Sequence, residues 1–282
     1  MSAVVPHIER HGSFSPDNQK IVFSTGSGFD RDLKIIDLIT NEVVNLTEND
    51  LEDSHPRWSP NGEWIVFQRE DTLGNRDLFL VKSDGSEEKN LTNTLEYREQ
   101  HPSFSSDGKM IIFDSNRDQK DLESEEHNYE IYSFDIEENK TERLTNWKHW
   151  DMYPSFSPDN SHIVWRRTIL IPGSDDKNFE IFVKNIETGK EWNITNNPSY
   201  DSNPYWNPQS DQIAFTSSRS GSFNIYLIKS DGSDLRMITQ AEGRSIGFSI
   251  PTISFNGKLI VADRYTKDVV DLVIVDISDE IK

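Results

Sequence analysis

Two series of residues recur along the chain with types and spacing that suit ligand binding or proton transfer. The first is acidic until its last place and consists of Glu9, Asp53, Glu99, Asp151, Asp201 and Phe248. The second lies two residues further on and consists of His11, His55, His101, Tyr153, Asn203 and Ile250. Carboxylates suit calcium or manganese, and imidazoles suit zinc or another transition metal. If the fold brings both series together, they could hold a divalent cation or act as acids and bases.

Each series also has a purely structural interpretation. A carboxylate just before a strand can cap exposed backbone N–H groups of the preceding loop. The histidines lie too far apart in sequence for any local metal-ligand motif, so only a ring-like fold could bring them together. The metal therefore stays unknown at this stage, and a cation at this place is an open hypothesis.

Each member of the second series opens a copy of one short motif. The clearest copy is His101-Pro-Ser-Phe-Ser-Ser106, followed by Asp107-Gly108. The aromatic or Ile residue at its fourth place falls at positions 14, 58, 104, 156, 206 and 253, at intervals of 44 to 52 residues. Self-similarity at such a period is typical of a repeat architecture.

Every repeat is predicted to contain short strands and no amphipathic helix. The motif is the first strand, and its Ser-Pro-Asp-Asn or Pro-Asn-Gly tail is turn chemistry. The second and third strands are brief β-branched and aromatic runs such as Trp64–Phe67 and Leu78–Val81. The fourth closes on an apolar-Thr pair, as at Leu46-Thr47. Four strands in each of six repeats predict an all-β, six-bladed β-propeller of four-stranded antiparallel blades.

The repeats leave no room for a second domain, so residues 1–282 are expected to form one propeller. The sixth repeat has no apolar-Thr strand, and an extra strand over residues 3–8 precedes the first repeat. We therefore expect this N-terminal strand to complete the last blade. The expected blades are 11–52, 53–98, 99–150, 151–200, 201–247, and 248–282 together with 1–10.

Composition limits the partners and the chemistry. The formal net charge of -20 disfavours nucleic acid, anionic membranes and acidic polysaccharides, although a local basic patch could override it. The chain has no cysteine, which excludes disulfides and thiolate sites. It has neither a signal-peptide pattern at its start nor an apolar run near the ~20 residues of a membrane span, so membrane insertion is not expected. A cytoplasmic protein is expected, or an extracytoplasmic one if the chain was trimmed.

The combined motifs resemble the WD40-like (PD40) repeat of TolB-type propellers over nearly the whole chain. The shared cadence is Phe/Trp-Ser-Pro-Asp/Asn, Ile-x-Phe, Asp/Asn-Ile-Tyr, Asp-Gly-Ser and Leu-Thr. The resemblance implies a propeller fold. Prolyl oligopeptidases and oligogalacturonate lyases carry related repeats. The chain has no Gly-x-Ser-x-Gly nucleophile motif of the former, and the His-rich metal site of the latter has no residue-by-residue match.

The loops before each first strand and after each second strand vary most, so their common face is the candidate functional face. Trp147 and Trp150 lie in one such loop and either bind a partner or pack between blades. Two enlarged loops, 114–129 and 166–179, should form one wall of this face. An arginine series follows the second strands, and it is predicted to pair with acids that open the third strands: Arg69–Asp77, Arg117–Glu130, Arg167–Glu180 and Arg264–Asp271.

Two functions from different classes remain open. The first is a non-catalytic scaffold without cofactor that binds a protein, a peptide or a small ligand. The second is a carbohydrate-active lyase or glycosidase with a site of histidines and carboxylates, with or without a metal, at the mouth of the central channel. The arc His11–His55–His101 and carboxylates such as Asp151 and Asp201 would do the acid–base work there, with the tryptophans as sugar platforms. No catalytic constellation is evident. The expected ligand-binding residues are His11, His55, His101, Tyr153, Asn203, Asp53, Glu99, Asp151, Asp201, Trp147 and Trp150.

Overall fold

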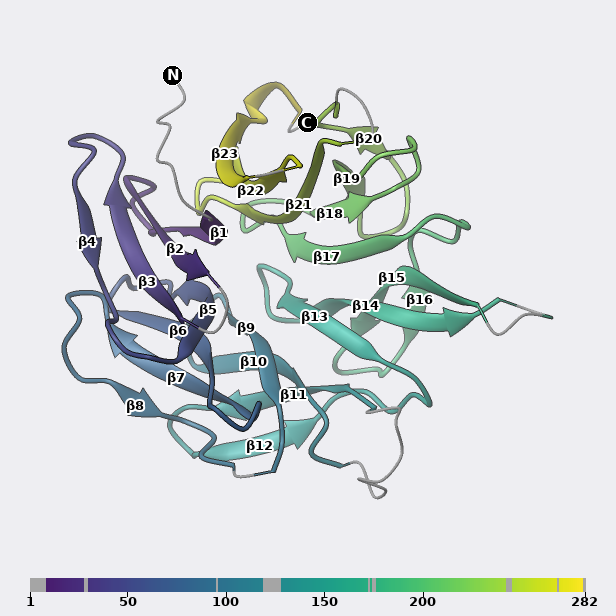
Figure 1. The fold of residues 1–282 in the computed structure, drawn as a ribbon. Coiled ribbons are helices and arrows are strands. Elements are labelled where there is room, and N and C mark those ends of the chain that lie inside the picture. The colour runs from purple at the N-terminus through teal and green to yellow at the C-terminus, as the bar shows by residue number, and fades with distance from the viewer. Residues whose placement is uncertain are drawn as a thin grey trace.

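The computed structural model describes residues 9–27, 30–94, 96–118, 128–171, 173, 176–241, 245–267 and 269–280. Within these ranges the chain is built from β-strands, with a single 3-10 turn, η1 (Ser278–Glu280), and no α-helix. The strands fall into successive groups along the chain, and these groups are arranged around a central axis as a β-propeller (Figure 1). In the described part of the chain, no helix is long and apolar enough to cross a membrane.

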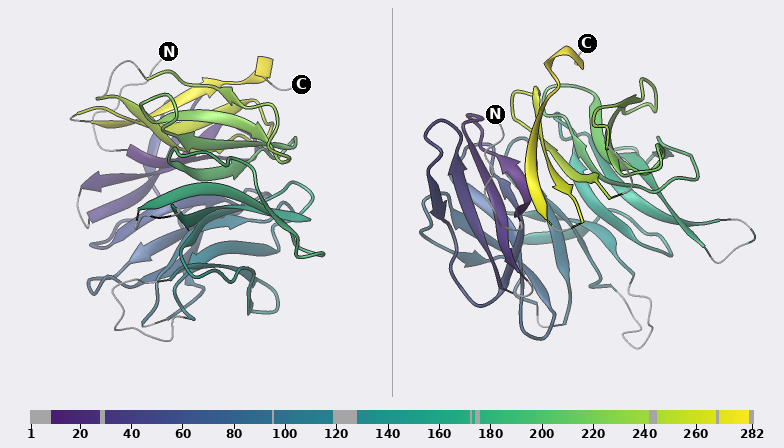
Figure 2. Two further views of the ribbon diagram at one scale, coloured as in Figure 1. Left: turned by 90° about the vertical axis from the view of Figure 1, so that its right-hand side faces the viewer. Right: turned by 45° about the horizontal axis from the view of Figure 1, so that its top comes forward.

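The first strand of each group lies nearest the axis. These strands are β1 (Glu9–Phe14), β5 (Glu52–Trp58), β9 (Glu99–Phe104), β13 (Asp151–Phe156), β17 (Asp201–Trp206) and β21 (Gly247–Ile253). Each contacts the first strands of the groups before and after it, and β1 contacts β21. The first strands therefore form a closed ring around the axis (Figure 1), and Figure 2 shows the same arrangement edge-on and tilted.

The second and third strands form the middle of each group. The second strands are β2 (Lys20–Ser27), β6 (Trp64–Glu70), β10 (Met110–Ser115), β14 (His162–Leu170), β18 (Gln212–Ser217) and β22 (Leu259–Tyr265). The third strands are β3 (Asp30–Asp37), β7 (Arg76–Lys82), β11 (Glu130–Asp135), β15 (Lys177–Asn185), β19 (Asn224–Lys229) and β23 (Val270–Asp276). The apolar runs predicted as second and third strands lie within these elements.

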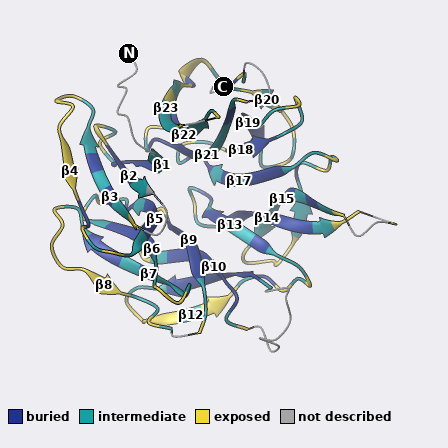
Figure 3. Ribbon diagram, viewed as in Figure 1, coloured by how far each residue is buried: buried dark blue, intermediate teal, exposed yellow. Residues whose placement is uncertain are grey.

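The fourth strands are short and lie at the rim. They are β4 (Val43–Asn45), β8 (Lys89–Asn90), β12 (Lys140–Arg143), β16 (Glu191–Asn193) and β20 (Arg236–Met237). Figure 3 shows that exposure concentrates on this rim, at β4, β8 and β12, whereas strands near the axis are largely buried. The core consists of apolar layers between neighbouring groups, such as Val22 and Leu33 packed with Trp58 and Phe67.

The apolar-Thr pairs directly follow the fourth strands and fasten them to the third strands. The backbone N–H of Leu33 donates to Thr47 Oγ1 over 2.9 Å, and the Thr47 hydroxyl donates to Asp32. Ile131, Thr145 and Glu130 repeat this arrangement. The acids that open the third strands are therefore held by threonine hydroxyls, which explains why the apolar-Thr signature recurs.

The hydrogen-bonded sheets do not reproduce the predicted count of six separate blades. The described residues form five sheets: one of eight strands, three of four strands and one of three strands. The eight-stranded sheet arises because one parallel bridge between Arg31 and Glu52 joins β1–β4 to β5–β8. Apart from this bridge, the strands pair antiparallel, in groups of four as predicted, except that the last sheet has only β21, β22 and β23 among the described residues.

The predicted closing strand over residues 3–8 lies outside the described residues. The described residues still join the two ends of the chain, because Thr252 Oγ1 donates to the Gly12 carbonyl over 2.7 Å. The backbone N–H of His11 also donates to Asp263 Oδ1 over 2.8 Å. These two bonds connect β1 to the last sheet.

Candidate functional site

The residues of the second series share an unusual backbone conformation. Each sits in a β-bulge of a first strand, where the pairing register with the second strand shifts. Each has a positive φ, between 51° for Ile250 and 60° for His11. A non-glycine residue in this region costs of order 1–3 kcal/mol, and such residues cluster at functional sites. We call this set the axial series: His11, His55, His101, Tyr153, Asn203 and Ile250.

Side chains of the second strands hold several of these bulges in place. Asp114 Oδ1 accepts the backbone N–H of Tyr153 over 3.0 Å, and Gln68 Oε1 accepts that of His101 over 2.9 Å. Asp263 does the same for His11, and Thr216 Oγ1 for Ile250 over 3.2 Å. Sequence reasoning did not single out these four residues. They differ in type from repeat to repeat, and their only common signal is their place in the second strand.

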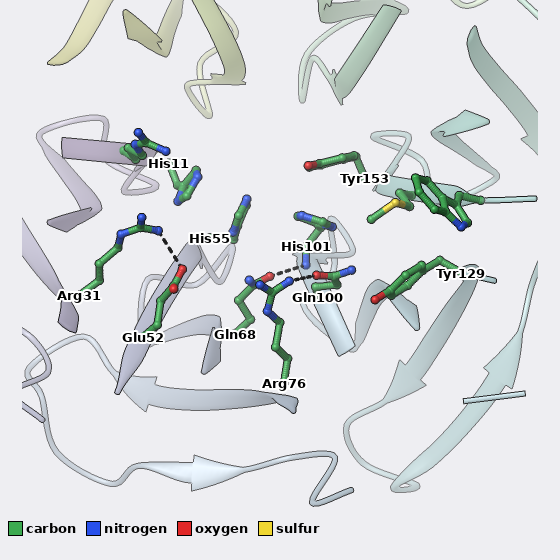
Figure 4. A pocket seen from close by; sticks show the side chains of 13 residues that line it. His11, Arg31, Glu52, His55, Gln68, Arg76, Gln100, His101, Tyr129 and Tyr153 are labelled. Atoms are coloured by element: carbon green, nitrogen blue, oxygen red, sulfur yellow. Dashed lines mark hydrogen bonds and ion pairs between the residues drawn. The ribbon is translucent and has the colours of Figure 1, made fainter. Parts of the chain in front are cut away.

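Four axial side chains meet at a cavity of about 380 Å³ at the predicted functional face. His11 and His55 stack with ring centroids 3.7 Å apart, and the His101 ring stands edge-on to His55 at 4.6 Å. His101 in turn lies 3.8 Å from the Tyr153 ring. Figure 4 shows this row of rings along one side of the cavity. The prediction that the three histidines come together is therefore matched by their positions.

His55 differs from its neighbours in its hydrogen bonding. His11 Nδ1 lies 3.1 Å from Ser24 Oγ, and His101 Nδ1 lies 2.8 Å from Asp114 Oδ1. Both ring nitrogens of His55 are buried, and neither has a hydrogen-bond partner in the described part of the chain. Buried polar groups are normally paired, and leaving one unpaired costs about 1–3 kcal/mol. His55 is therefore a polar group that a ligand in the cavity could satisfy.

Burial keeps the axial histidines neutral. It lowers the pKa of His11 and of His55 well below the ordinary value, and nearby cations add to the effect. It also lowers the pKa of His101, although the Asp114 carboxylate opposes this shift. A neutral imidazole offers one N–H donor and one acceptor nitrogen. The row of rings can thus donate and accept hydrogen bonds without carrying charge.

Three arginines supply positive charge to the same cavity: Arg10, Arg31 and Arg76. Arg31 pairs with Glu52 over 2.8 Å. Arg76 pairs with Glu70 over 2.5 Å and also donates to the Gln100 side-chain carbonyl. The lining also contains aromatic and apolar side chains, those of Tyr129, Trp150, Met152 and Tyr153.

The acidic series does not reach this cavity, which corrects the expectation that both series converge. The side chains of Asp53, Glu99, Asp151 and Asp201 are completely buried, and each binds an arginine of the adjacent second strand or the loop after it. Asp151 accepts two bonds from Arg167, over 2.8 and 2.7 Å. The acid–base role predicted for Asp151 and Asp201 therefore has no basis in their positions.

The arginine partners also differ from the prediction. Of the predicted pairs, only Arg264–Asp271 forms, at 3.1 Å. Arg69 binds Asp53 and Glu88, and Arg167 binds Asp151 and Glu191. Glu130 and Glu180 instead accept threonine hydroxyls, as described above for the fourth strands. Except for Arg264, each arginine of the series therefore binds the buried acid of its own first strand.

The remaining predicted residues lie in different places. Trp150 lines the cavity, with Lys177 Nζ 4.8 Å from its ring centroid. Trp147 does not line it, because its indole N–H donates to the Thr168 carbonyl and its ring lies 4.8 Å from the Arg167 guanidinium. Asn203 lies deeper, in a constriction of about 20 Å³ that His101 and Tyr153 also line.

The metal hypothesis finds no ligand set in the described part of the chain. No group of three or more His, Asp and Glu side chains there has an arrangement that could hold a metal ion. The reason lies in the geometry: the histidine rings stack on one another, and the acidic series is turned away and paired with arginine. The loop residues 119–127, which belong to one enlarged loop, lie outside the described residues.

Solved structures of other propellers share this fold. A TolB-type protein from Agrobacterium tumefaciens matches with a TM-score of 0.72 and 19% identity, over 95% of this chain and 91% of its own. TolB from Acinetobacter baumannii matches with a TM-score of 0.67 and 19% identity, over 84% of this chain and 55% of its own. An oligogalacturonate lyase from Vibrio parahaemolyticus matches with a TM-score of 0.65 and 15% identity, over 98% and 93%. At these identities the likeness concerns the fold alone.

The present chain thus corresponds to about half the length of the Acinetobacter protein. No curated protein matches it by sequence. The family model of the TolB beta propeller domain, in contrast, matches residues 125–281, which is more than half of the chain. On this match, the chain belongs to the TolB beta propeller domain family.

Proposed function

We propose that this propeller is a non-catalytic binding module that holds a peptide, a protein segment or a small ligand in the cavity lined by the axial series, which we call the channel mouth. One observation carries the proposal: His55 presents two buried, unpartnered ring nitrogens at a cavity of about 380 Å³. The volume falls in the range of small-molecule sites, which combine apolar walls with a few polar groups. The strained bulge at His55, with φ of 54°, further supports a role for this residue beyond stability.

The ligand contacts that we propose are the residues that line the cavity. From the predicted set these are His11, His55, His101, Tyr153 and Trp150. The buried acids Asp53, Glu99, Asp151 and Asp201 take a supporting role, because their arginine pairs stiffen the strands that carry the axial series. Large aromatic side chains such as Trp150 and Tyr153 give contact area at a low entropy cost.

We also infer that the ring has six blades. This interpretation counts the eight-stranded sheet as two blades, since one parallel bridge alone connects its two antiparallel groups. The boundaries are then 11–52, 53–98, 99–150, 151–200 and 201–247, with 248–282 and 1–10 forming the last blade. Protection of the backbone amides of residues 3–8 from hydrogen exchange would support the closing strand, and rapid exchange of all of them would contradict it.

Ligand-observed NMR with a mixture of short peptides and small acids, alcohols and amides tests the binding function. We expect some of these compounds to bind the wild-type chain and to lose binding in Tyr153→Ala, which removes one cavity wall. A Tyr226→Ala variant serves as a control, because Tyr226 is buried within β19 and does not line the cavity. If no compound distinguishes the two variants, the channel mouth is not the binding site.

The carbohydrate-active alternative keeps one favourable observation. His101 Nδ1 lies 2.8 Å from the buried Asp114 carboxylate, which fixes the ring and leaves the other nitrogen of a cavity-lining imidazole available. Such a pair can act as a general base. Incubation with a panel of neutral and acidic oligosaccharides tests this function. Cleavage that disappears in Asp114→Asn would establish it over the binding module, and a panel that is neither bound nor cleaved would end it.

A further inference from the structure

The two sides of the channel mouth differ in chemical character, and this difference says what kind of ligand fits. Figure 4 shows Arg31 and Arg76 on the side of His11 and His55, and Tyr129 on the side of Tyr153, at the other end of the row of rings. The first side offers guanidinium groups and neutral imidazoles. The second offers flat aromatic faces and the Met152 thioether. A ligand that contacts both sides needs a polar end and an apolar body.

The charges at the polar side are not balanced. Arg31 and Arg76 are neutralised by Glu52 and Glu70. Arg10 forms no ion pair with any described carboxylate, and its Nε is buried without a hydrogen-bond partner. An arginine is charged at any physiological pH. Among the described residues, Arg10 therefore has no carboxylate in ion-pair contact, although the buried Asp263 lies near enough to interact with its charge.

Two further arginines close to the cavity strengthen this excess. Arg57 lies in the constriction below and, within the described part, donates only to the Pro56 carbonyl. Arg166 is buried, and the hydrogen bonds described for it go to the Tyr200 hydroxyl and the Met152 sulfur. Neither forms an ion pair with a described carboxylate. The mouth is thus locally cationic on a chain whose formal net charge is -20.

Three carboxyls near the axial series reduce this excess only in part. Asp114 accepts bonds from His101 and from the Tyr153 backbone, so it is already engaged. Burial raises the pKa of Asp263 to about 7, and burial together with Asp271 raises that of Glu9 to about 7. Both carboxyls are therefore only partly ionised near neutral pH. The balance still favours an anionic ligand, and one free guanidinium at the cavity favours a single negative charge.

We propose that the channel mouth binds a monocarboxylate with an aromatic body, its carboxylate facing Arg10, Arg76 and His55 and its ring packed against Trp150, Met152 and Tyr153. The inference rests on the proposed function and specifies its ligand class. Guanidinium groups form strong, often bidentate hydrogen bonds with carboxylates, and a neutral imidazole N–H can donate to the same group. The same chemistry is present in a free aromatic acid and in a peptide that ends in an aromatic residue.

Two matched pairs of probes separate charge from shape. Indole-3-acetate and indole-3-acetamide represent the free acid, and N-acetyltryptophan and N-acetyltryptophanamide represent the chain end. In calorimetric titrations we expect the carboxylate of at least one pair to bind at least tenfold more tightly than its amide. Preference confined to the first pair identifies a small acid, and preference confined to the second identifies a peptide end. Inorganic phosphate should compete weakly, because it lacks the aromatic body.

Variants at Arg10 assign the preference to the mouth. Arg10→Gln should abolish the difference between acid and amide, and Arg10→Lys should keep most of it. The fold should persist, since Arg10 has no described ion pair to lose. Arg236→Gln is the matched control: it removes the same charge from the outer strand β20, where Arg236 pairs with Asp234 and Glu280.

The outcomes distinguish this inference from the proposed function. If acid and amide bind equally well and both are lost in Tyr153→Ala, the mouth binds ligands but the anionic class is wrong. If phosphate competes as well as the aromatic acids, the aromatic half of the proposal is wrong. If neither Arg10→Gln nor Tyr153→Ala changes the binding of any probe, both the ligand class and the proposed function fail.

Discussion

The acidic series and the axial series lie two residues apart in the chain, yet they end in opposite surroundings. Asp53 is buried and bound by Arg69, whereas His55 faces the cavity with unpaired nitrogens. In a regular strand, residues i and i+2 point to the same face. The bulge between Ser54 and Arg57, together with the positive φ of His55, breaks this alternation.

The difference separates residues that maintain the fold from residues that are free to act. The acids satisfy their charge with arginine inside the ring of strands, so they have no bonding capacity left for a ligand. The axial residues carry backbone strain, and His55 leaves hydrogen bonds unmade, so they add little to stability. Positions where local rules are broken without compensation are the ones expected at functional sites.

Removing one acid should have the largest effect on stability. Asp151→Ala removes the bidentate partner of the Arg167 guanidinium, whose side chain is only 6% exposed, and leaves this cation with the partly exposed Glu191 alone. Breaking a buried ion pair in this way typically costs about 3–5 kcal/mol. Urea unfolding monitored by tryptophan fluorescence should show a loss of this size.

Two further variants test whether the loss comes from burial of the charge. Replacing both partners, with Asp151→Leu and Arg167→Met, should recover most of the stability, since apolar substitutes remove the uncompensated cation. Glu142→Ala, which breaks an exposed pair with Lys140 at the rim, should leave the midpoint unchanged. If Asp151→Ala keeps full stability but loses ligand binding, the acid belongs to the site and our distinction between the two series is wrong.

Much of the fold follows from the sequence, because strand periodicity and turn residues are local signals. The runs Trp64–Phe67 and Leu78–Val81 lie within β6 and β7, where the pattern predicts strands. The direction of Asp53 could not be predicted, because the spacing alone does not reveal that a bulge separates it from His55. The hydrogen bonds by which Asp114 and Gln68 hold the bulges could not be predicted either. Equivalent positions carry different residue types, and each side chain accepts a bond from the first strand of the next group.

The axial histidines should also make stability depend on pH in a definite direction. The pKa of His55 in the folded chain lies well below 6.5, its ordinary value, because the ring is buried. At low pH the unfolded chain therefore binds a proton that the folded chain does not. The neutral His55 ring therefore has no effect on the pH dependence of the free energy of unfolding well above pH 6.5, and it lowers that free energy as the pH falls below 6.5. Between pH 6.5 and 5.5 this decline amounts to about 1 kcal/mol.

Unfolding free energies at pH 7.5, 6.5 and 5.5 test this dependence. His55→Gln cannot take up the proton, so its stability should fall by about 1 kcal/mol less than that of the wild type over the lower interval. His11→Gln should behave alike, since burial shifts the pKa of His11 in the same direction. Asp263 has the opposite sign: its pKa of about 7 lies above 3.8, so its contribution is lost as the pH rises through that range. Asp263 is present in the wild type and in the variants, so its contribution cancels when their stabilities are compared. If the wild type and His55→Gln lose stability in parallel as the pH falls, His55 is not neutral in the folded chain.

The smallest expected effect concerns backbone strain within the axial series itself. Ile250 has a φ of 51° and Asn203 one of 52°, so the two bulges impose the same conformation on very different side chains. A β-branched residue is poorly suited to this region, whereas asparagine tolerates it. Ile250→Asn should therefore stabilise the chain by roughly 0.5–1 kcal/mol, and Asn203→Ile should destabilise it by a similar amount, both measured by thermal unfolding. Opposite signs in two equivalent bulges would show that strain, rather than packing, governs these positions. If both substitutions destabilise equally, side-chain contacts outweigh the backbone, and the strain at His55 would no longer support a functional role for that residue.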